Sequence, residues 1–285
     1  MSTSVPQLFA SLIDDAAVFP PGNAPLPAAV AGHRQHRAGW HADLVGPLLV
    51  PASSLAKLPP LLGDDEQINI GVIGDVPLDE LGAACDGVDE RIRVHQVEAP
   101  AAQRGEDPLP GLDRLLAIAR KRPHLDAYAE LPLTSGLLDG LDLLARSRAD
   151  GVRIAAKFRT GGLAAEFFPT PIELAAVICA CRDRQLPFKL TAGLHNAVRH
   201  TAPETGFHHH GYLNVLVAAA AAAKGAEAGD VAAWLDTTDA AVLCEEAGAR
   251  RHEVRPLWVG YGSCSIEEPL ADLVRLGLID GGFEQ

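Results

Sequence analysis

The sequence has few basic residues and few aromatic residues for its length of 285 residues. Lys and Arg number 24 against 37 Asp and Glu, so the formal net charge is −13, and only 5% of the residues are aromatic. A net negative charge disfavours a surface that binds nucleic acid or an anionic membrane. We therefore expect a small-molecule substrate as partner, with no nucleic acid and no membrane.

The sequence also lacks a disulfide framework and a long hydrophobic run. Its five cysteines are odd in number and show neither framework nor metal-motif spacing, which indicates reduced thiols and a cytoplasmic protein. No basic segment followed by an apolar stretch opens the chain, so we expect no signal peptide. The longest apolar run, Val215–Ala223, is too short to span a bilayer. It suits close helix packing, either within the molecule or in a homo-oligomer.

Hydrophobic residues make up 48% of the chain and form short apolar runs that alternate with helical patterns. The predicted strands lie within residues 8–19, 45–50, 68–73, 92–97, 125–131, 153–162, 187–194 and 256–262. The predicted helices cover residues 27–37, 78–85, 111–122, 137–148, 171–184, 212–224, 231–247 and 269–276.

This alternation predicts an α/β protein with a parallel sheet, and eight such units favour a closed barrel. We expect a single (β/α)₈ TIM barrel over residues 1–285, with a helical insertion at 197–254 between strands seven and eight. A doubly wound open sheet would need a glycine-rich turn after the first strand. The segment Phe19-Pro20-Pro21-Gly22 is not such a turn.

Two neighbouring predicted strands each carry a lysine followed by a glycine turn. Lys157 precedes Gly161 and Lys189 precedes Gly193, with one predicted helix between them. In a barrel both side chains lie at the carboxyl ends of adjacent strands, where barrel active sites form. A lysine beside another cation is shifted toward the neutral amine, which attacks a carbonyl to form a Schiff base. The alternative is structural: the lysines reach the rim, or one pairs with Glu130.

Other polar residues end the predicted strands and are candidates for the same site. Arg159 follows Lys157 by two positions and is either a ligand for an acidic group or a solvated side chain. His195 directly follows the Gly193 turn and is the best acid/base candidate among the histidines. Backbone N–H groups of the turn Gly262-Ser263-Cys264-Ser265 can surround an anion. The further strand-end residues are Asp14 or Asp15, Ser53, Asp75, Glu98 and Glu130.

A metal site is the competing interpretation of the histidines. His195, His200 and His208–His210 fall in one loop region, and together with Glu98 or Glu130 they offer ligands for a divalent metal. Three consecutive histidines cannot all point one way, however, and no His-x-x-x-His or Cys-x-x-Cys pair supports the site. We therefore expect no metal and no cofactor.

The order of the strand ends resembles that of the deoxyribose-phosphate aldolase family, class I aldolases that fold as (β/α)₈ barrels. The family's sixth-strand motif Lys-x-x-Thr-Gly is matched by Lys157-Phe158-Arg159-Thr160-Gly161. Its seventh-strand lysine is similar to Lys189, although one more residue precedes Gly193 here. Its small eighth-strand turn is similar to Gly262–Ser265, and four earlier segments agree loosely: Leu12–Asp15, Leu49–Ser53, Val72–Gly74 and Ala129-Glu130.

The resemblance implies that Lys157 is the Schiff-base lysine and that Lys189 is the neighbour that lowers its pKa. The chain departs from the family in three respects. The family's fourth-strand aspartate has no counterpart, and Glu98 is the nearest acid. Arg159 stands where the family has a small residue, and the segment Ala197–Val254 is foreign to it.

The leading hypothesis is a lyase of the class I aldolase type that acts on a small, optionally phosphorylated carbonyl compound. Its predicted catalytic residues are Lys157, Lys189, Glu98 and His195. Its predicted substrate-binding residues are Asp15, Glu130, Arg159, Thr160, Gly161, Gly193, Gly262, Ser263 and Ser265. Two alternatives remain open: a metal-dependent hydrolase or isomerase that uses Glu130, His195 and His208–His210, and a non-catalytic barrel that binds a metabolite.

Overall fold

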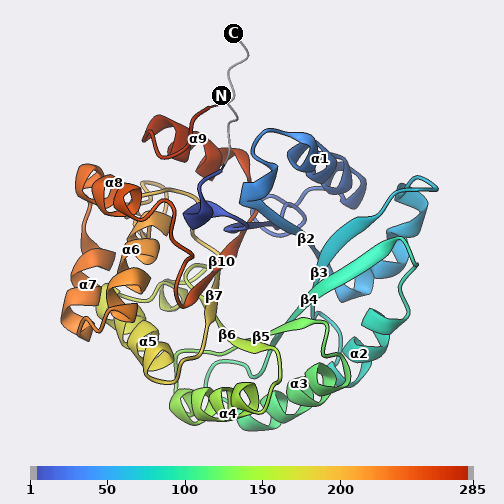
Figure 1. The fold of residues 1–285 in the computed structure, drawn as a ribbon. Coiled ribbons are helices and arrows are strands. Elements are labelled where there is room, and N and C mark those ends of the chain that lie inside the picture. Colours follow the sequence, from blue (N-terminus) through green and yellow to red (C-terminus); the bar gives the residue numbers. More distant parts are fainter. Residues whose placement is uncertain (1–4, 282–285) are drawn as a thin grey trace.

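The computed structural model describes residues 5–281, and its centre is a closed barrel of parallel strands ringed by helices (Figure 1). Around the barrel the strand order is β1-β10-β7-β6-β5-β4-β3-β2, and every neighbouring pair is parallel. The predicted (β/α)₈ TIM barrel is therefore confirmed.

The elements follow one another in the alternation that the sequence predicts. The barrel strands are β1 (Ile13–Asp15), β2 (Val45–Pro51), β3 (Ile68–Ile73), β4 (Ile92–Pro100), β5 (Asp126–Glu130), β6 (Ile154–Arg159), β7 (Phe188–Thr191) and β10 (Trp258–Ser263). The helices are α1 (Leu26–Ala38), α2 (Leu78–Asp86), α3 (Leu109–Lys121), α4 (Leu137–Ala149), α5 (Pro171–Asp183), α6 (Tyr212–Ala223), α7 (Ala228–Asp236), α8 (Ala240–Ala249) and α9 (Glu267–Arg275). A small antiparallel hairpin, β8 (His200–Thr201) and β9 (His208–His209), lies between β7 and α6.

Two element predictions were wrong. The first strand is only three residues long, because Gln7–Phe9 forms a 3₁₀ turn and Ser11 has a left-handed φ of 48°. The single helix predicted over 231–247 is two helices, α7 and α8. The Asp239 side chain accepts a hydrogen bond from Ala241 N at 2.9 Å and so caps a new helix.

The segment between β7 and β10 supplies an inner and an outer layer. Helix α6 is buried along most of its length, and its Tyr212 ring stacks on Tyr261 of β10 with ring centroids 6.0 Å apart. The alanine-rich run of α6 therefore packs inside the molecule, where small side chains allow close approach. Helices α7 and α8 lie outside α6, in the orange part of Figure 1.

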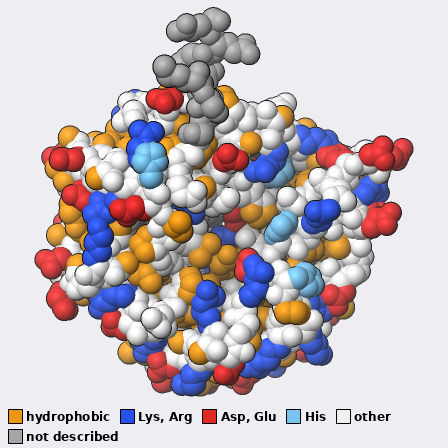
Figure 2. All heavy atoms as spheres, viewed as in Figure 1, with side chains coloured by type: hydrophobic (Ala, Val, Ile, Leu, Met, Phe, Trp, Pro, Cys, Tyr) orange, Lys and Arg blue, Asp and Glu red, His pale blue; other side chains and the backbone are white. Residues whose placement is uncertain are grey.

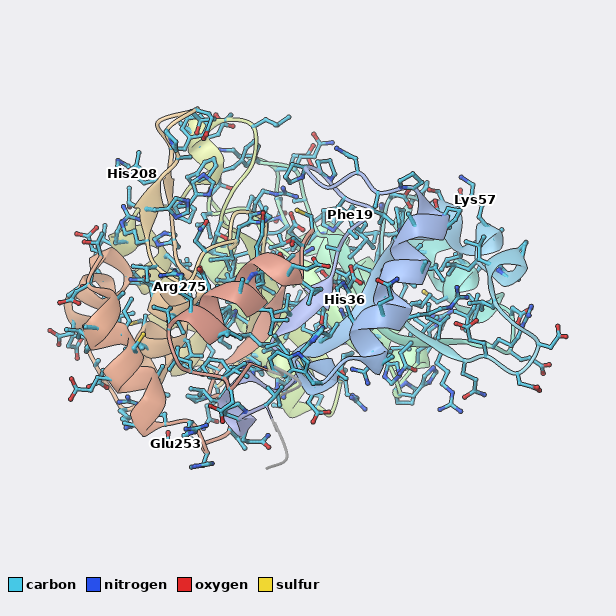
Figure 3. All side chains as sticks on the ribbon, turned by 90° about the horizontal axis from the view of Figure 1, so that it is seen from above. Phe19, His36, Lys57, His208, Glu253 and Arg275 are labelled. Carbon is cyan, nitrogen blue, oxygen red and sulfur yellow. The ribbon has the colours of Figure 1, made fainter. Side chains whose placement is uncertain are left out.

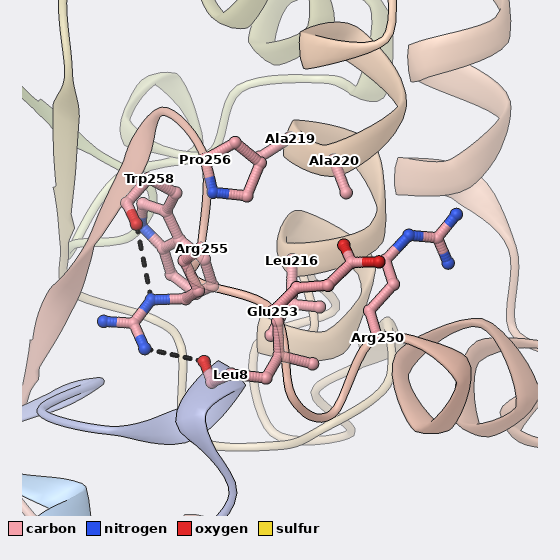
Figure 4. A pocket seen from close by; sticks show the side chains of 9 residues that line it. All are labelled: Leu8, Leu216, Ala219, Ala220, Arg250, Glu253, Arg255, Pro256 and Trp258. Carbon is pink, nitrogen blue, oxygen red and sulfur yellow. Dashed lines mark hydrogen bonds between the residues drawn. The ribbon is translucent and has the colours of Figure 1, made fainter.

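The loops that follow the strands gather at one end of the barrel. Figure 3 places Phe19, which follows β1, and His208, which follows β7, at this end, and Glu253, which precedes β10, at the other. At the other end Arg255 donates to the carbonyls of Leu8 at 2.7 Å and Ala10 at 2.8 Å. The cavity beside Arg255 and Trp258 measures only ≈10 Å³, room for a single water (Figure 4).

Two glycines make room for polar side chains inside the barrel. A Cβ atom at Gly46 of β2 would lie 2.0 Å from Asp14 Oδ1, and one at Gly71 of β3 would lie 2.8 Å from Gln96 Nε2. Both positions therefore face the barrel interior. Their lack of a side chain lets Asp14 and Gln96 extend across it.

The outer surface carries both signs of charge. On the face shown in Figure 2, acidic and basic side chains are interspersed, and hydrophobic side chains gather near its centre. Over residues 5–281, no helix combines the length and the apolar character needed to cross a membrane.

We predict that Gly111→Ala lowers the free energy of unfolding by about 1–3 kcal/mol, the usual cost of overpacking. Gly111 lies in the first turn of α3, and a Cβ there would be 1.8 Å from the Ala101 carbonyl oxygen, a backbone atom that cannot rotate away. Gly32→Ala in α1 is the matched control. Nothing lies within 4 Å of its Cβ position, so alanine should raise stability by up to about 1 kcal/mol. Urea unfolding measures the free energy of unfolding of both variants. Equal values for Gly111→Ala and Gly32→Ala would contradict the packing argument.

Candidate functional site

Charged side chains fill the interior of the barrel toward the ends of its strands. We call this group the interior cluster; it comprises Asp14, Gln96, Glu98, Glu130, Lys157, Arg159 and Lys189. Its three cations and three carboxylates balance, which suits a low-dielectric interior because each buried charge has an opposite partner.

Lys157 lies at the centre of the cluster and is only 4% exposed. Its Nζ is 2.9 Å from Glu98 Oε2 and 2.9 Å from Glu130 Oε2. Strand register explains the arrangement: Lys157 on β6 is paired with Glu130 on β5 and with Lys189 on β7. Residues in register on parallel strands point to the same side, so all three side chains enter the barrel.

Lys189 forms the second cationic centre. Its Nζ donates to Asp14 Oδ2 and, at 2.6 Å, to Glu98 Oε1, and it lies 4.7 Å from the centroid of the Tyr128 ring. Strand β10 separates Lys189 from Asp14 but has glycines at 260 and 262, in register with these two residues. No side chain therefore stands between the lysine and the aspartate.

Glu98 joins the two lysines, as its carboxylate contacts one lysine with each oxygen. Gln96 Nε2 donates to Glu98 Oε1 at 2.9 Å and to Asp14 Oδ2 at 2.6 Å. Glu98 was among the residues predicted from the sequence, whereas Gln96 was not. The two-residue period of β4 was the signal that could have found it, because Gln96 and Glu98 lie on the same face.

The pKa of Lys157 is raised, contrary to the expectation that Lys189 lowers it. Burial lowers this pKa, but the carboxylates of Glu98 and Glu130 together raise it by more. Burial also lowers the pKa of Lys189, but Asp14 and Glu98 raise it by more, so this pKa is raised as well. Both lysines are therefore ammonium ions in the resting protein. The structural alternative, in which one lysine pairs with Glu130, describes the contact at Lys157. The expectation of a lowered pKa was wrong because it weighed only the neighbouring lysine and not Glu98 and Glu130.

The pKa values of the three carboxylates are shifted in different directions. Burial alone would raise the pKa of Glu98, but Lys157 and Lys189 lower it to about 2. Burial raises the pKa of Glu130, but Lys157 and Arg159 lower it by more, so this pKa is lowered as well. At Asp14 burial outweighs Lys189, so the pKa is raised. Asp14 is thus the carboxylate of the cluster that most readily takes up a proton.

Asp15, the predicted substrate ligand on β1, points away from the interior cluster. Its Oδ2 lies 3.1 Å from His33 Nδ1 of α1, and its Oδ1 accepts from Ala17 N at 3.2 Å. The neighbouring Asp14 enters the cluster instead. Adjacent residues of a strand face opposite sides, and a three-residue strand gave no pattern to decide between them.

The threonine and glycines of the lysine motifs bring two turns together. Thr160 Oγ1 donates to the Ala192 carbonyl at 2.6 Å, and a Cβ at Gly161 would lie 2.9 Å from the Cα of Gly193. Gly193 has a φ of +78°, which glycine adopts without strain. These residues hold the ends of β6 and β7 in contact and so fix the positions of the two lysines.

The turn after β10 is occupied by its own hydrogen bonds. Ser263 Oγ donates to the Ser265 carbonyl at 2.6 Å, and Ser265 Oγ accepts from Glu268 N at 3.2 Å at the start of α9. Gly262 faces Leu49, whose Cδ1 would be 3.0 Å from an added Cβ. The serine hydroxyls of this turn thus bond within the turn and to the start of α9, and anion binding by its backbone N–H groups stays a prediction.

His195 pairs with this turn. Its Nδ1 is 2.9 Å from Glu268 Oε2, and its Nε2 is 3.9 Å from Cys264 Sγ. The hydrogen bond with Cys264 and the charge of Glu268 raise the pKa of His195 despite its burial. The contacts of His195 are thus with the β10 turn, while Lys157 and Lys189 pair within the interior cluster.

The histidine-rich turn, His208–His210, packs against the loop that contains Phe168 and Pro169. His210 Nε2 donates to the Pro169 carbonyl at 2.8 Å, and the Phe168 ring lies 4.8 Å from the rings of both Phe207 and His209. His208 pairs separately with Thr201. In the described part of the chain, no three His, Cys, Asp or Glu side chains gather with the geometry of a metal site. The turn thus contacts Phe168 and Pro169.

A cavity of ≈510 Å³ opens beside the ends of β5 and β6, and we call it the mouth cavity. Glu130 and Arg159 connect it to the interior cluster, and Arg104 and Glu166 add further charges. Its apolar lining includes Leu131, Pro132, Leu133, Phe167, Phe168 and Pro169. The volume is typical of a small-molecule site, and the lining combines apolar wall with polar and charged side chains.

Comparison of the chain with protein-family models, curated proteins and solved structures gave no significant match. The site must therefore be interpreted from its own geometry.

Proposed function

We propose that this barrel is an enzyme of the class I aldolase type that forms a Schiff base between Lys157 and a small carbonyl compound in the mouth cavity. One observation carries the proposal: Glu130 belongs both to the cavity wall and to the ion pair of Lys157, at 2.9 Å. A carbonyl compound that moves the Glu130 side chain aside meets Lys157 Nζ directly. The buried amine then lies at the inner end of an open cavity, as covalent catalysis requires.

The rest of the interior cluster supports this chemistry. Glu98 contacts both lysines and so supplies a fourth-strand carboxylate, the group that the aldolase resemblance calls for at this place. The chain of contacts from Lys157 through Glu98 and Lys189 to Asp14 offers a route for protons. Asp14, whose pKa is raised, is its natural acceptor.

The reaction begins with Lys157 as an ammonium ion. Lys157 loses one proton, either to Glu130 as this side chain leaves the ion pair or through Glu98 and Lys189 to Asp14. The free amine attacks the carbonyl carbon and forms the C–N bond. The carbonyl oxygen leaves as water with the two hydrogens lost from the nitrogen. The resulting iminium withdraws electrons from the adjacent carbon, so that a carbon–carbon bond there is cleaved or formed.

Borohydride trapping tests the proposal. Incubation with small aldehydes, oxo acids and sugar phosphates plus borohydride should give a covalent adduct by intact mass, which peptide mapping should place on Lys157. Lys157→Met should abolish it, whereas Lys224→Met, at an exposed position, should not. Circular dichroism checks that Lys157→Met folds, with Glu98 still paired to Lys189 at 2.6 Å and Glu130 to Arg159 at 3.3 Å. An undiminished adduct in Lys157→Met would overturn the proposal.

A non-catalytic metabolite-binding barrel is the second candidate. The observation in its favour is the double ion pair of Lys157, which holds the amine in its protonated form. Saturable binding of a carbonyl compound without any trapped adduct would favour this function. The metal-dependent alternative gains no comparable support, because Glu130, His195 and His208–His210 pair with different partners.

A further inference from the structure

The Glu130 carboxylate bridges two cations at the inner wall of the mouth cavity. Its Oε2 lies 2.9 Å from Lys157 Nζ, and its Oε1 lies 3.3 Å from both Nε and Nη2 of Arg159. The two cations are therefore held one carboxylate apart. Lys157 and Arg159 are two residues apart on β6, so their side chains leave the same face of the strand and both reach Glu130 on β5.

The two cations differ in their access to the cavity. The Arg159 side chain is 44% exposed and lines the cavity, whereas the Lys157 side chain is 5% exposed and lies behind Glu130. A ligand that enters the cavity thus meets the guanidinium first and the amine second. Its anionic group is expected to bind Arg159, since planar guanidinium and carboxylate groups pair well.

The other charged residues of the cavity are Arg104, Glu166 and Glu173. Glu173 accepts from Thr170 N at 2.8 Å as part of the capping box of α5, and Arg104 lies 3.9 Å from Glu166. The walls between these groups are apolar, with Leu131, Leu133 and Phe168 among them. Arg159 differs from Arg104 because it shares the Glu130 carboxylate with Lys157, so an anionic group next to a carbonyl is assigned to this pair of cations. The other end of the ligand then lies against apolar wall.

We propose that the substrate is a 2-oxo acid, an inference that rests on the Schiff-base function proposed above. In a 2-oxo acid the carboxylate and the carbonyl are directly bonded neighbours. The molecule thus spans the same two cations that Glu130 now bridges, with its carboxylate on Arg159 and its C2 carbonyl at Lys157. A neutral aldehyde leaves Arg159 without a partner, and in a phosphorylated aldehyde several bonds separate the anion from the carbonyl.

The covalent step balances without a further reactant. The Lys157 ammonium and the 2-oxo acid give an iminium at C2 and one water, which carries the carbonyl oxygen and two hydrogens from the nitrogen. Glu130 takes up and returns one of these protons as it leaves the bridge. Borohydride then adds hydride to C2, so the trapped protein gains the mass of the oxo acid less one oxygen atom.

The test compares pyruvate with propanal, its neutral analogue, and with lactate, which has the carboxylate but no carbonyl. At equal concentration we expect at least about tenfold more borohydride adduct with pyruvate than with propanal. Arg159→Gln should reduce the pyruvate adduct by about tenfold or more, which is the usual effect of losing one charged hydrogen-bonding partner. Arg153→Gln is the matched control, because Arg153 is also well exposed but pairs with Asp126 outside the cavity. It should leave the adduct unchanged.

Ligand-detected NMR without borohydride separates this inference from the proposed function. Arg159-dependent binding of pyruvate over lactate, with no adduct from any compound, would support the 2-oxo acid site and overturn the Schiff base. Adduct formation with propanal that equals that with pyruvate would overturn the 2-oxo acid site and leave the Schiff base intact. Lactate binding as tight as pyruvate binding would also overturn the 2-oxo acid site.

Discussion

Glu98→Gln is expected to lower the free energy of unfolding by about 3–5 kcal/mol, the usual cost of removing one partner from a buried ion pair. Glu98 is 1% exposed, and its carboxylate contacts both buried lysines. The neutral amide leaves Lys157 with Glu130 and Lys189 with Asp14, so the barrel interior keeps one cation in excess. Urea unfolding at neutral pH measures the difference.

The pH dependence of stability provides the control. In the folded protein the pKa of Glu98 is about 2, below its ordinary value of 4.5. Its contribution of about 3 kcal/mol is therefore fully present above the unfolded pKa and is lost as the pH falls toward 2. Glu98→Gln should lack this part of the acid loss. Asp126→Asn, at an exposed ion pair of β5, should cost less than about 1 kcal/mol. Similar losses in the two variants would contradict the central role of Glu98.

The barrel was predictable from the sequence because local patterns determine it. Helix α5 begins at Pro171 after Thr170, whose side chain completes a capping box with Glu173, and strand β3 coincides with the predicted run Ile68–Ile73. Short apolar runs bounded by turns and helices leave a parallel sheet as the main solution. The strand ends then follow, and with them the presence of Lys157 and Lys189 at one end of the barrel.

The electrostatics of the site were not predictable in the same way. Whether a lysine is neutral depends on how many carboxylates lie within a few ångströms, and Glu98 is 59 positions from Lys157 while Asp14 is 175 from Lys189. The same holds for the mouth cavity. Its Phe168 wall is held by Phe207, His209 and His210, contacts between separate loops that the sequence shows only as a histidine-rich turn.

The raised pKa of Lys157 makes a strong prediction for the kinetics of trapping. Below the pKa of an amine, its neutral fraction increases tenfold with each pH unit. Because Glu98 and Glu130 raise the pKa of Lys157 above 10.5, the rate of adduct formation should rise about tenfold per pH unit, or about a hundredfold between pH 7 and pH 9. The rate is measured by intact mass after short incubations at fixed substrate concentration, with circular dichroism to confirm the fold at each pH.

The control for this profile is a free lysine derivative trapped with the same compound, which has the ordinary amine pKa and corrects for the reactivity of the carbonyl. A protein profile that is flat between pH 7 and pH 9 would mean that Lys157 is already neutral at pH 7. Bound substrate would then have broken the ion pair with Glu130 before the chemical step. A rising profile means that proton loss from Lys157 limits the reaction, so the same carboxylates that stabilise the barrel also restrain its nucleophile.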